Sequence, residues 1–147
     1  MKTPTSRQPT HFRGLSSELQ ELIGVATLAR ARAYAPHSNF PVGAAIRTRA
    51  GVVYIGCNVE NSSYGATMCA ERVAIFSAVA ADERDFAAIA LVADLAEPLK
   101  PCGMCRQVLL ELAPELTVVM ANLAGHVLVA TIKDLLPAPF LMPKHPR

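Results

Sequence analysis

The sequence predicts an α/β domain of three layers (α-β-α), in which one mixed five-stranded sheet lies between helices. Three observations predict it: helix-like and strand-like segments alternate along the chain, residues 86–93 are continuously apolar, and no internal repeat interrupts this order. A continuously apolar strand is typical of a sheet that is covered on both faces. A chain of 147 residues is long enough to form a single domain with its own core.

The first third of the chain is expected to form a helix followed by a hairpin. Residues 17–33 carry apolar side chains at helical spacing, and Ser17 and Gln20 stand at the spacing of a capping box. Alternating apolar residues in 42–46 predict a strand, and a turn then leads into a second strand over 52–56. These two strands are expected to pair with each other.

The rest of the chain alternates helices with strands. The expected order of the whole chain is α-β-β-α-β-α-β-β-α. The elements expected here are a helix that follows Cys69 and runs to about residue 81, a strand at 86–93, a helix at 102–112, strands at 116–120 and 126–130, and a short helix capped by Thr131-Ile132-Lys133-Asp134.

Composition excludes several classes of protein. The chain is 52% hydrophobic and 18% charged, which is typical of globular domains, and it has no apolar run near the roughly 20 residues of a membrane helix. A net charge of only +2 does not favour a nucleic-acid partner. Four cysteines without a signal peptide indicate a reducing cytoplasm. Residues 1–14 are expected to be a flexible extension, 15–140 the domain, and 141–147 a Pro-rich basic tail.

Three thiols and one carboxylate lie in two short segments, each of which leads into a helix. The segments are Cys69-Ala70-Glu71-Arg72 and Pro101-Cys102-Gly103-Met104-Cys105-Arg106-Gln107. Thiolates bind zinc, and a tetrahedral site with three protein ligands keeps one position for water. The pattern C-x-E…P-C-x-x-C is the all-cysteine form of the zinc-dependent nucleobase deaminase signature.

The spacing of these residues sets a condition on the fold. Cys102 and Cys105 are three residues apart and share a helix face, whereas Cys69 and Glu71 diverge by about 200° on a regular helix. They can meet one ion only if Cys69 is the non-helical cap residue and Glu71 lies in the first turn. A carboxylate in that place can move protons to and from the reacting groups.

The charge of the site also needs an explanation. Zinc with three thiolates carries a net charge of −1, so something nearby must offset it. Arg72 and Arg106, each close in sequence to a cysteine, and the positive ends of two helices are the local candidates.

Two other interpretations of the cysteines remain open at this point. A lone C-x-x-C is also typical of a redox pair or of half a structural zinc site. Cys57 could supply a fourth sulfur and close the site, giving a structural zinc module without catalysis. The four histidines have no ligand spacing, so none of them is assigned to a metal.

Beyond the two cysteine segments, further motifs resemble the small homotetrameric cytidine deaminase family. The resemblance runs from about Leu15 to Phe140, and its motifs stand at residues 38–45, 56–65, 69–72, 101–109 and 135–140. It implies the fold of that family and a zinc-dependent hydrolysis of cytidine and deoxycytidine to the uridine forms, with release of ammonia, in pyrimidine salvage. It also implies a homotetramer with active sites shared between subunits.

The resemblance implies a role for individual residues. Cys69, Cys102 and Cys105 would hold zinc, Glu71 would move protons, and Arg72 would temper the thiolate charge. Residues implied in substrate binding are Phe40, Asn58, Glu60 and Ala70 of the same subunit, with Tyr64 and Phe140 reaching a neighbouring subunit's site. The alternative within enzymes is a deaminase of another aminopyrimidine nucleoside, such as a blasticidin-type compound.

Overall fold

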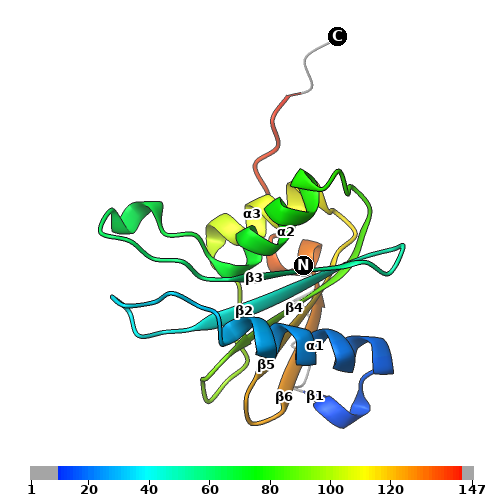
Figure 1. Cartoon of the computed structure of the whole chain (residues 1–147). Coiled ribbons are helices and arrows are strands. Elements are labelled where there is room, and N and C mark those ends of the chain that lie inside the picture. The colour runs from blue at the N-terminus through cyan, green and yellow to red at the C-terminus, as the bar shows by residue number, and fades with distance from the viewer. Residues whose placement is uncertain (1–9, 144–147) are drawn as a thin grey trace.

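The computed structural model describes residues 10–143 and contains one mixed sheet between two layers of helices (Figure 1). The strand order is β1-β6-β5-β4-β2-β3. The elements are β1 (Thr10–His11), η1 (Phe12–Gly14), α1 (Ser17–Arg30), β2 (Val42–Thr48), β3 (Val53–Cys57), η2 (Tyr64–Ala66), α2 (Ala70–Ala80), β4 (Phe86–Ala93), α3 (Gly103–Leu112), β5 (Thr117–Asn122), β6 (His126–Thr131) and α4 (Ile132–Leu135).

The predicted α/β class is confirmed, but the sheet has six strands rather than five. The added strand is β1, in which Thr10 and His11 pair antiparallel with Val127 and His126 of β6. Two residues are too few to show a period of two in the sequence, which is why the pattern did not predict this strand. Residues 10–14, part of the expected flexible extension, thus form β1 and η1, while residues 1–9 and 144–147 lie outside the described part of the chain.

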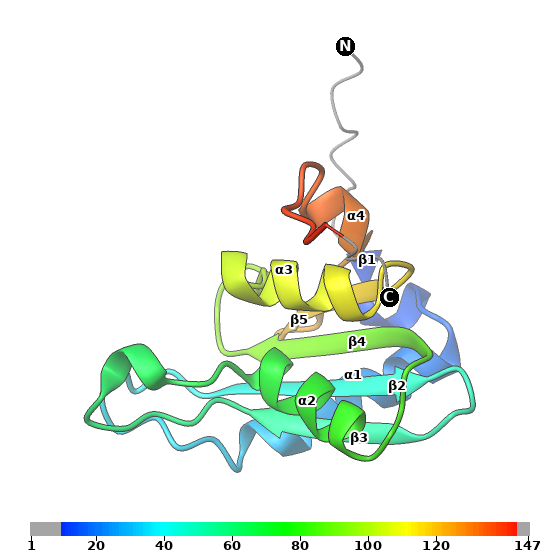
Figure 2. The ribbon, with the colours of Figure 1, turned by 90° about the horizontal axis from the view of Figure 1, so that it is seen from above.

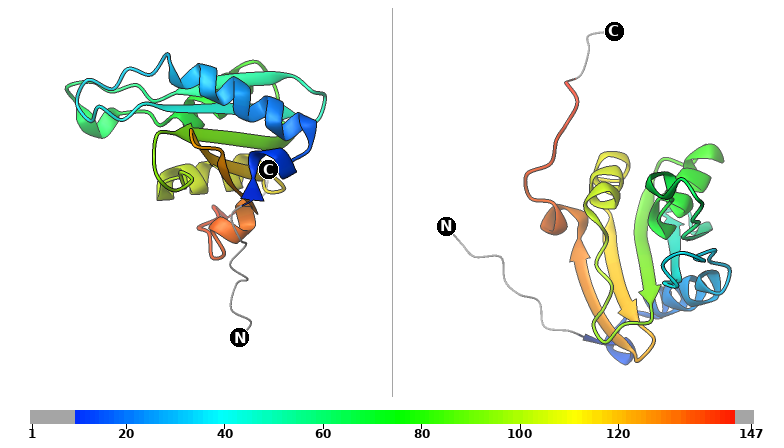
Figure 3. Two further views of the ribbon diagram at one scale, coloured as in Figure 1. Left: turned by 90° about the horizontal axis from the view of Figure 1, so that it is seen from below. Right: turned by 90° about the vertical axis from the view of Figure 1, so that its left-hand side faces the viewer.

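Strand β4 lies inside the sheet and is buried on both faces, as its apolar sequence predicts. It pairs parallel with β5 and antiparallel with β2. Ile89 and Leu91 belong to the core under α2 and α3, whereas Ala90 and Val92 belong to the core under α1. This alternation is the period of two of a strand, and it gives the sheet one core on each face. Figure 3 shows the helices on both sides of the sheet.

The beginning and the end of α1 differ from the prediction. The N-cap is Ser16, in extended conformation, and no side-chain capping bond forms; Gln20 Nε2 instead donates to the Leu15 carbonyl at 2.9 Å. The predicted capping box at Ser17 is therefore wrong, because the helix begins one residue earlier than that box requires. The helix also ends at Arg30 rather than near residue 33, and residues 31–33 continue in turns. The second capping box, Thr131 with Asp134 at α4, is confirmed.

Two glycines bring the helices into close contact with the sheet. A Cβ atom on Gly43 would lie 2.0 Å from the carbonyl oxygen of Ala26 in α1. A Cβ atom on Gly56 would lie 2.2 Å from the carbonyl oxygen of Ala70 and 2.5 Å from the backbone nitrogen of Ala74, both in α2. Gly56 therefore allows the first turn of α2 to lie directly on β3.

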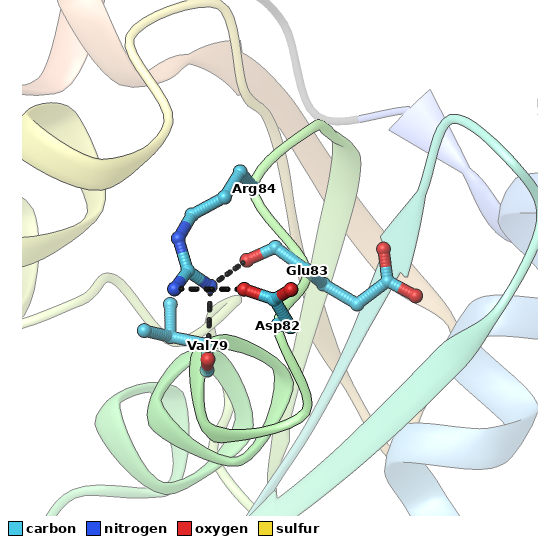
Figure 4. Close-up of polar contacts among 4 residues, drawn as sticks. All are labelled: Val79, Asp82, Glu83 and Arg84. Carbon is cyan, nitrogen blue, oxygen red and sulfur yellow. Dashed lines mark hydrogen bonds and ion pairs between the residues drawn. The ribbon is translucent and has the colours of Figure 1, made fainter.

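Helix α2 is closed at its C-terminal end by a compact turn (Figure 4). Asp82 takes a positive φ of 68°, and Arg84 Nη1 donates to the carbonyl oxygens of Val79 and Glu83 at 2.9 and 2.8 Å. The Arg84 guanidinium also lies 3.3 Å from the Asp82 carboxylate. A cation at this end of a helix is favourable because the last carbonyl groups carry partial negative charge. In residues 10–143 we find no helix with the length and apolar character to cross a bilayer.

Candidate metal centre and cavity

The N-terminal ends of α2 and α3 lie at the same side of the molecule and bring the two cysteine segments together (Figure 2). Cys69 is the N-cap of α2, with extended φ and ψ of −70° and 152°, and Glu71 lies in the first turn. Cys102 is the N-cap of α3, and Cys105 lies in its first turn. The spacing of Cys69 and Glu71 required a non-helical cap residue followed by an acid in the first turn, and the structure has this arrangement. Two helix N-termini then direct unpaired N–H groups and positive partial charge toward the sulfur atoms.

The three thiols are spaced as a zinc ion requires. Their sulfur atoms all lie within 4.8 Å of one another, and Cys69 Sγ and Cys102 Sγ are 3.9 Å apart. Zinc bound tetrahedrally at about 2.3 Å from each sulfur would hold two of them roughly 3.8 Å apart. The donor set therefore fits zinc.

Cys57 does not join these three cysteines. Its sulfur contacts the Arg32 carbonyl oxygen at 3.4 Å, and it is not part of the three-thiol group. All four cysteines are unpaired thiols in the structure. The geometry thus gives no support to a closed four-sulfur site, and it keeps the fourth position of the three-thiol site free of Cys57.

Arg72 provides the positive charge beside the thiols. Its Nη2 donates to Cys69 Sγ at 3.3 Å and to the Thr67 carbonyl oxygen at 3.4 Å. The pKa of Cys69 is lowered to about 5, because the Cys105 thiol and then Arg72 donate to its thiolate, against the effect of burial. The pKa of Cys105 is raised, since its thiol donates to Cys69 and is buried. A cation that displaces the remaining protons completes such a site.

Arg106, the other arginine expected to offset the thiolate charge, has a different set of contacts. Its Nε donates to the Pro101 carbonyl oxygen at 2.8 Å, and its Nη1 donates to the Leu135 carbonyl oxygen at 3.0 Å. These bonds tie the loop before α3 to the end of α4. Arg106 therefore holds the fold around the site and donates to no sulfur.

Glu71 is a buried carboxyl group next to the thiols. Its residue is only 4% exposed, and burial raises its pKa to about 7, with a further contribution from the negative charge of Cys69. A carboxyl group with a pKa near neutrality can both accept and return a proton at physiological pH. This is the property that proton transfer at the site requires.

A cavity of about 240 Å³ opens beside Glu71 and the thiols. Its volume is slightly below the range of ≈300–1,000 Å³ that is common for ligand pockets, so it suits a small ligand. Eight of the site residues expected from the sequence line it: Phe40, Asn58, Glu60, Tyr64, Cys69, Ala70, Glu71 and Cys102. A larger hollow of about 460 Å³ lies between residues 11–13 and 123–125, and no thiol or carboxylate lines it.

Asn58 and Glu60 are bonded to the chain segment that carries Phe40. Asn58 Oδ1 accepts from the Val42 backbone N–H, and its Nδ2 donates to the Phe40 carbonyl oxygen, both at 2.8 Å. Glu60 Oε2 accepts from the backbone N–H of His37 at 2.8 Å. Glu60 is 3% exposed; burial acts to raise its pKa, but hydrogen bonds from Ser38 and from backbone N–H groups outweigh burial and lower it. Glu60 is thus held as a carboxylate.

The segment of Asn58 and Glu60 is also linked to the thiol site through the backbone. Val59 exchanges two backbone hydrogen bonds with Met68, the residue before Cys69, at 3.0 and 3.1 Å. On its other side, Tyr34 donates to the Asn58 carbonyl and accepts from the Glu60 N–H. The two ends of the cavity are therefore parts of one continuous hydrogen-bonded framework.

Tyr64 and Phe140 have different positions. Tyr64 lines the cavity of its own chain, is 54% exposed, and stands edge-on to the His37 ring with centroids 5.8 Å apart. Phe140 is 65% exposed and does not line the cavity; its carbonyl oxygen accepts from Gln107 Nε2 at 2.6 Å. Within one chain, therefore, Tyr64 lines the cavity and Phe140 does not.

The sequence analysis assigned no role to several residues that line the cavity. They are Ser38, Val42, Thr67, Leu99 and Lys100. Ser38 stands in the motif that includes Phe40, so the motif marked the segment but not the hydroxyl. Val42 stands in the same motif, as the first residue of β2. No motif indicated a role for Thr67, Leu99 or Lys100, which reach the cavity from loops.

Comparison with known proteins places these features in a family. A sequence model of the cytidine and deoxycytidylate deaminase zinc-binding region matches residues 16–121. A cytidine deaminase of Sporosarcina psychrophila is 46% identical over 84% of this chain and 91% of that protein. A cytidine deaminase of Halalkalibacterium halodurans is 50% identical over 82% of this chain and 92% of that protein.

The fold has solved counterparts. The crystal structure of a cytidine deaminase from Burkholderia pseudomallei superposes with a TM-score of 0.82 at 53% identity, covering 86% of this chain and all of that chain. A blasticidin-S deaminase of Bacillus cereus is less similar, with 34% identity over 84% of this chain and 92% of that protein.

Proposed function

The chain belongs to the cytidine and deoxycytidylate deaminase family, and we propose that it is a zinc-dependent hydrolase that converts cytidine and deoxycytidine to uridine and deoxyuridine with release of ammonia. The observation that carries the proposal is the position of Glu71. Its buried carboxyl group, with a pKa raised to about 7, lines the same small cavity as two of the three thiols that fit zinc.

Cys69, Cys102 and Cys105 are the residues that would hold zinc. When bound, zinc supplies the positive charge that makes a water molecule a good nucleophile at neutral pH. Glu71 would accept a proton from the attacking water and would pass protons to the ring nitrogen and the leaving amino nitrogen of cytosine. Arg72, through its bond to Cys69 Sγ, limits the negative charge that the sulfur atoms place next to Glu71.

The other cavity residues bind the nucleoside in this proposal. Asn58 and Glu60 hydrogen-bond the sugar hydroxyls, because an amide and a carboxylate together offer donors and acceptors. Phe40 and Ala70 lie against the base. A site with such polar groups rejects a ligand that leaves them unmatched, so cytosine without its sugar is expected to be a poor substrate.

Assembly is part of the proposal. Large apolar side chains are exposed on α2 and α3 and next to them, among them Phe76 at 40% and Met104 at 62%. Such surfaces are typical of contacts between subunits. We assign them to a homotetramer in which Tyr64 and Phe140 reach the site of a neighbouring subunit, with a deaminase domain over residues 15–140. The unpaired thiols suit a cytoplasmic enzyme of pyrimidine salvage.

The test is direct. Purified zinc-loaded protein is incubated with cytidine, deoxycytidine, cytosine and blasticidin S, and ammonia release is measured for each. We expect turnover of the two nucleosides, while Glu71→Gln keeps its zinc and loses at least about 10²-fold in kcat. Absence of turnover with both nucleosides refutes the proposed substrate, and turnover of blasticidin S alone establishes the alternative.

A further inference from the structure

Ser38 is the residue that connects the carboxylate of Glu60 to the aromatic residue Phe40. The Ser38 hydroxyl donates to Glu60 Oε1 in a short hydrogen bond. Ser38 Oγ in turn accepts from the Phe40 backbone N–H at 3.1 Å. Because Phe40 already donates to this oxygen, the hydroxyl proton is left to point at Glu60. Ser38 also lines the cavity, beside both of these partners.

The backbone completes the contacts of Glu60. Glu60 Oε2 accepts from the N–H groups of His37 at 2.8 Å and Ser38 at 3.2 Å. The chain bends directly after them, at Asn39, which has a positive φ of 52°. This short bend is therefore where the segment supplies all three donors to one carboxylate.

These contacts limit what Glu60 can still bind. An ionised carboxylate has about four acceptor positions and no donor. Three are used by His37 and Ser38, which leaves about one for a ligand. A side chain that is 3% exposed and bonded on both oxygens has one orientation, so the remaining position has a defined direction.

We infer that Ser38 is a positioning residue that holds the Glu60 carboxylate so that it accepts one sugar hydroxyl of the nucleoside, and that Ser38 thereby sets selectivity for the sugar. This inference rests on the proposed function, in which Glu60 binds the sugar. Ser38 itself acts through Glu60 and takes no part in the chemical step.

The test separates positioning from general stability. In Ser38→Ala, Glu60 loses one of its three donors, so we expect KM for cytidine to rise about tenfold with kcat within about threefold of wild type. Ser38→Thr keeps the hydroxyl and is expected to restore most of the KM. Ser38→Cys keeps the volume without a strong donor, and is expected to behave like Ser38→Ala.

A double-mutant comparison shows whether Ser38 acts through Glu60. Glu60→Gln alone is expected to raise KM, and Ser38→Ala added to it is expected to raise KM little further, since the two changes remove one interaction. The small activity toward cytosine, which has no sugar, is expected to be equal in wild type and Ser38→Ala.

The possible failures are distinguishable. If wild type does not deaminate cytidine, the proposed function is wrong. If wild type is active and Ser38→Ala has an unchanged KM, the inference about Ser38 is wrong. It is also wrong if the double variant raises KM by the product of the two single-variant factors, because the two residues would then act independently. A fall in kcat toward both cytidine and cytosine would show that Ser38 serves only the fold, which also overturns it.

Discussion

A methyl group at Gly56 tests whether packing of α2 on the sheet holds the site together. In Gly56→Ala the new Cβ would meet the Ala70 carbonyl oxygen at 2.2 Å, whereas ordinary contact begins at 3.4 Å. The atoms that the Cβ meets, the Ala70 carbonyl oxygen and the Ala74 nitrogen, belong to the backbone and cannot rotate away. The first turn of α2 therefore has to move by roughly 1.2 Å. That turn carries Glu71 and follows directly on Cys69, so both are displaced from the cavity.

The expected effect has two parts. Overpacking of this kind lowers the free energy of unfolding by about 1–3 kcal/mol. A displacement of about 1 Å at catalytic groups lowers kcat by about 100-fold. Urea denaturation measures the first, and ammonia release with cytidine the second. Zinc content by elemental analysis, after dialysis against a weak chelator, is expected to fall below one ion per chain.

Two other glycines provide controls. Gly43→Ala creates a similar clash, 2.0 Å from the Ala26 carbonyl oxygen, but against α1 on the opposite face of the sheet. It is expected to lose similar stability while keeping its zinc and most of its kcat. Gly103→Ala is next to Cys102 in sequence but meets nothing within 4 Å, and is expected to behave as wild type. The reasoning fails if Gly56→Ala is fully active, or if Gly43→Ala loses zinc to the same extent.

Three further predictions concern the charges and sulfur atoms of the site. Burial raises the pKa of Glu71 from 4.5 to about 7, so the unfolded chain loses this proton at lower pH than the folded chain, and the stability of the zinc-free protein falls as pH rises between these values. Glu71→Gln has no such titration. Its free energy of unfolding, measured in urea without zinc, is expected to exceed that of wild type by up to about 3 kcal/mol above pH 7 and to match it near pH 4.5. A difference that does not change with pH would contradict the raised pKa of Glu71. Cys57→Ser is expected to keep both zinc and activity, since this sulfur contacts Arg32 rather than the three-thiol group. Loss of zinc from this variant, measured by elemental analysis, would support a structural site with four sulfur ligands instead. Arg72→Gln removes the donor to Cys69 and is expected to weaken zinc binding about tenfold in a competition with a chelator, whereas an equal loss in Arg106→Gln, which donates to no sulfur, would show that the effect is not specific.

Residues close in sequence determined much of the chemistry. The positions of Cys69 and Glu71 allowed only one local geometry for a shared ion, with Cys69 as the cap and Glu71 in the first turn, and the structure has that geometry. The apolar run of β4 likewise predicted a strand with a core on each face. In both cases the spacing of side chains along a helix or strand is set by the backbone geometry itself.

Capping and charge were less predictable. Ser17 with Gln20 has the spacing of a capping box, yet Gln20 bonds to the Leu15 carbonyl because the helix begins one residue earlier. Arg72 follows Cys69 by three residues and Arg106 directly follows Cys105, but only Arg72 donates to a sulfur. A long side chain has several acceptors within reach, and the surrounding packing selects one of them.

By itself, the order of residues indicated the α/β class and the local geometry of each cysteine segment, since these depend on side-chain spacing within one turn of helix or along one strand. The contact between Cys69 and Cys102, which are 33 residues apart, depends on how α2 and α3 pack. Only the tertiary structure brought Ser38 to Glu60, added β1 to the sheet edge, and set α2 on Gly56. Those contacts join segments many residues apart, and their formation depends on how complete helices and strands pack rather than on any local pattern.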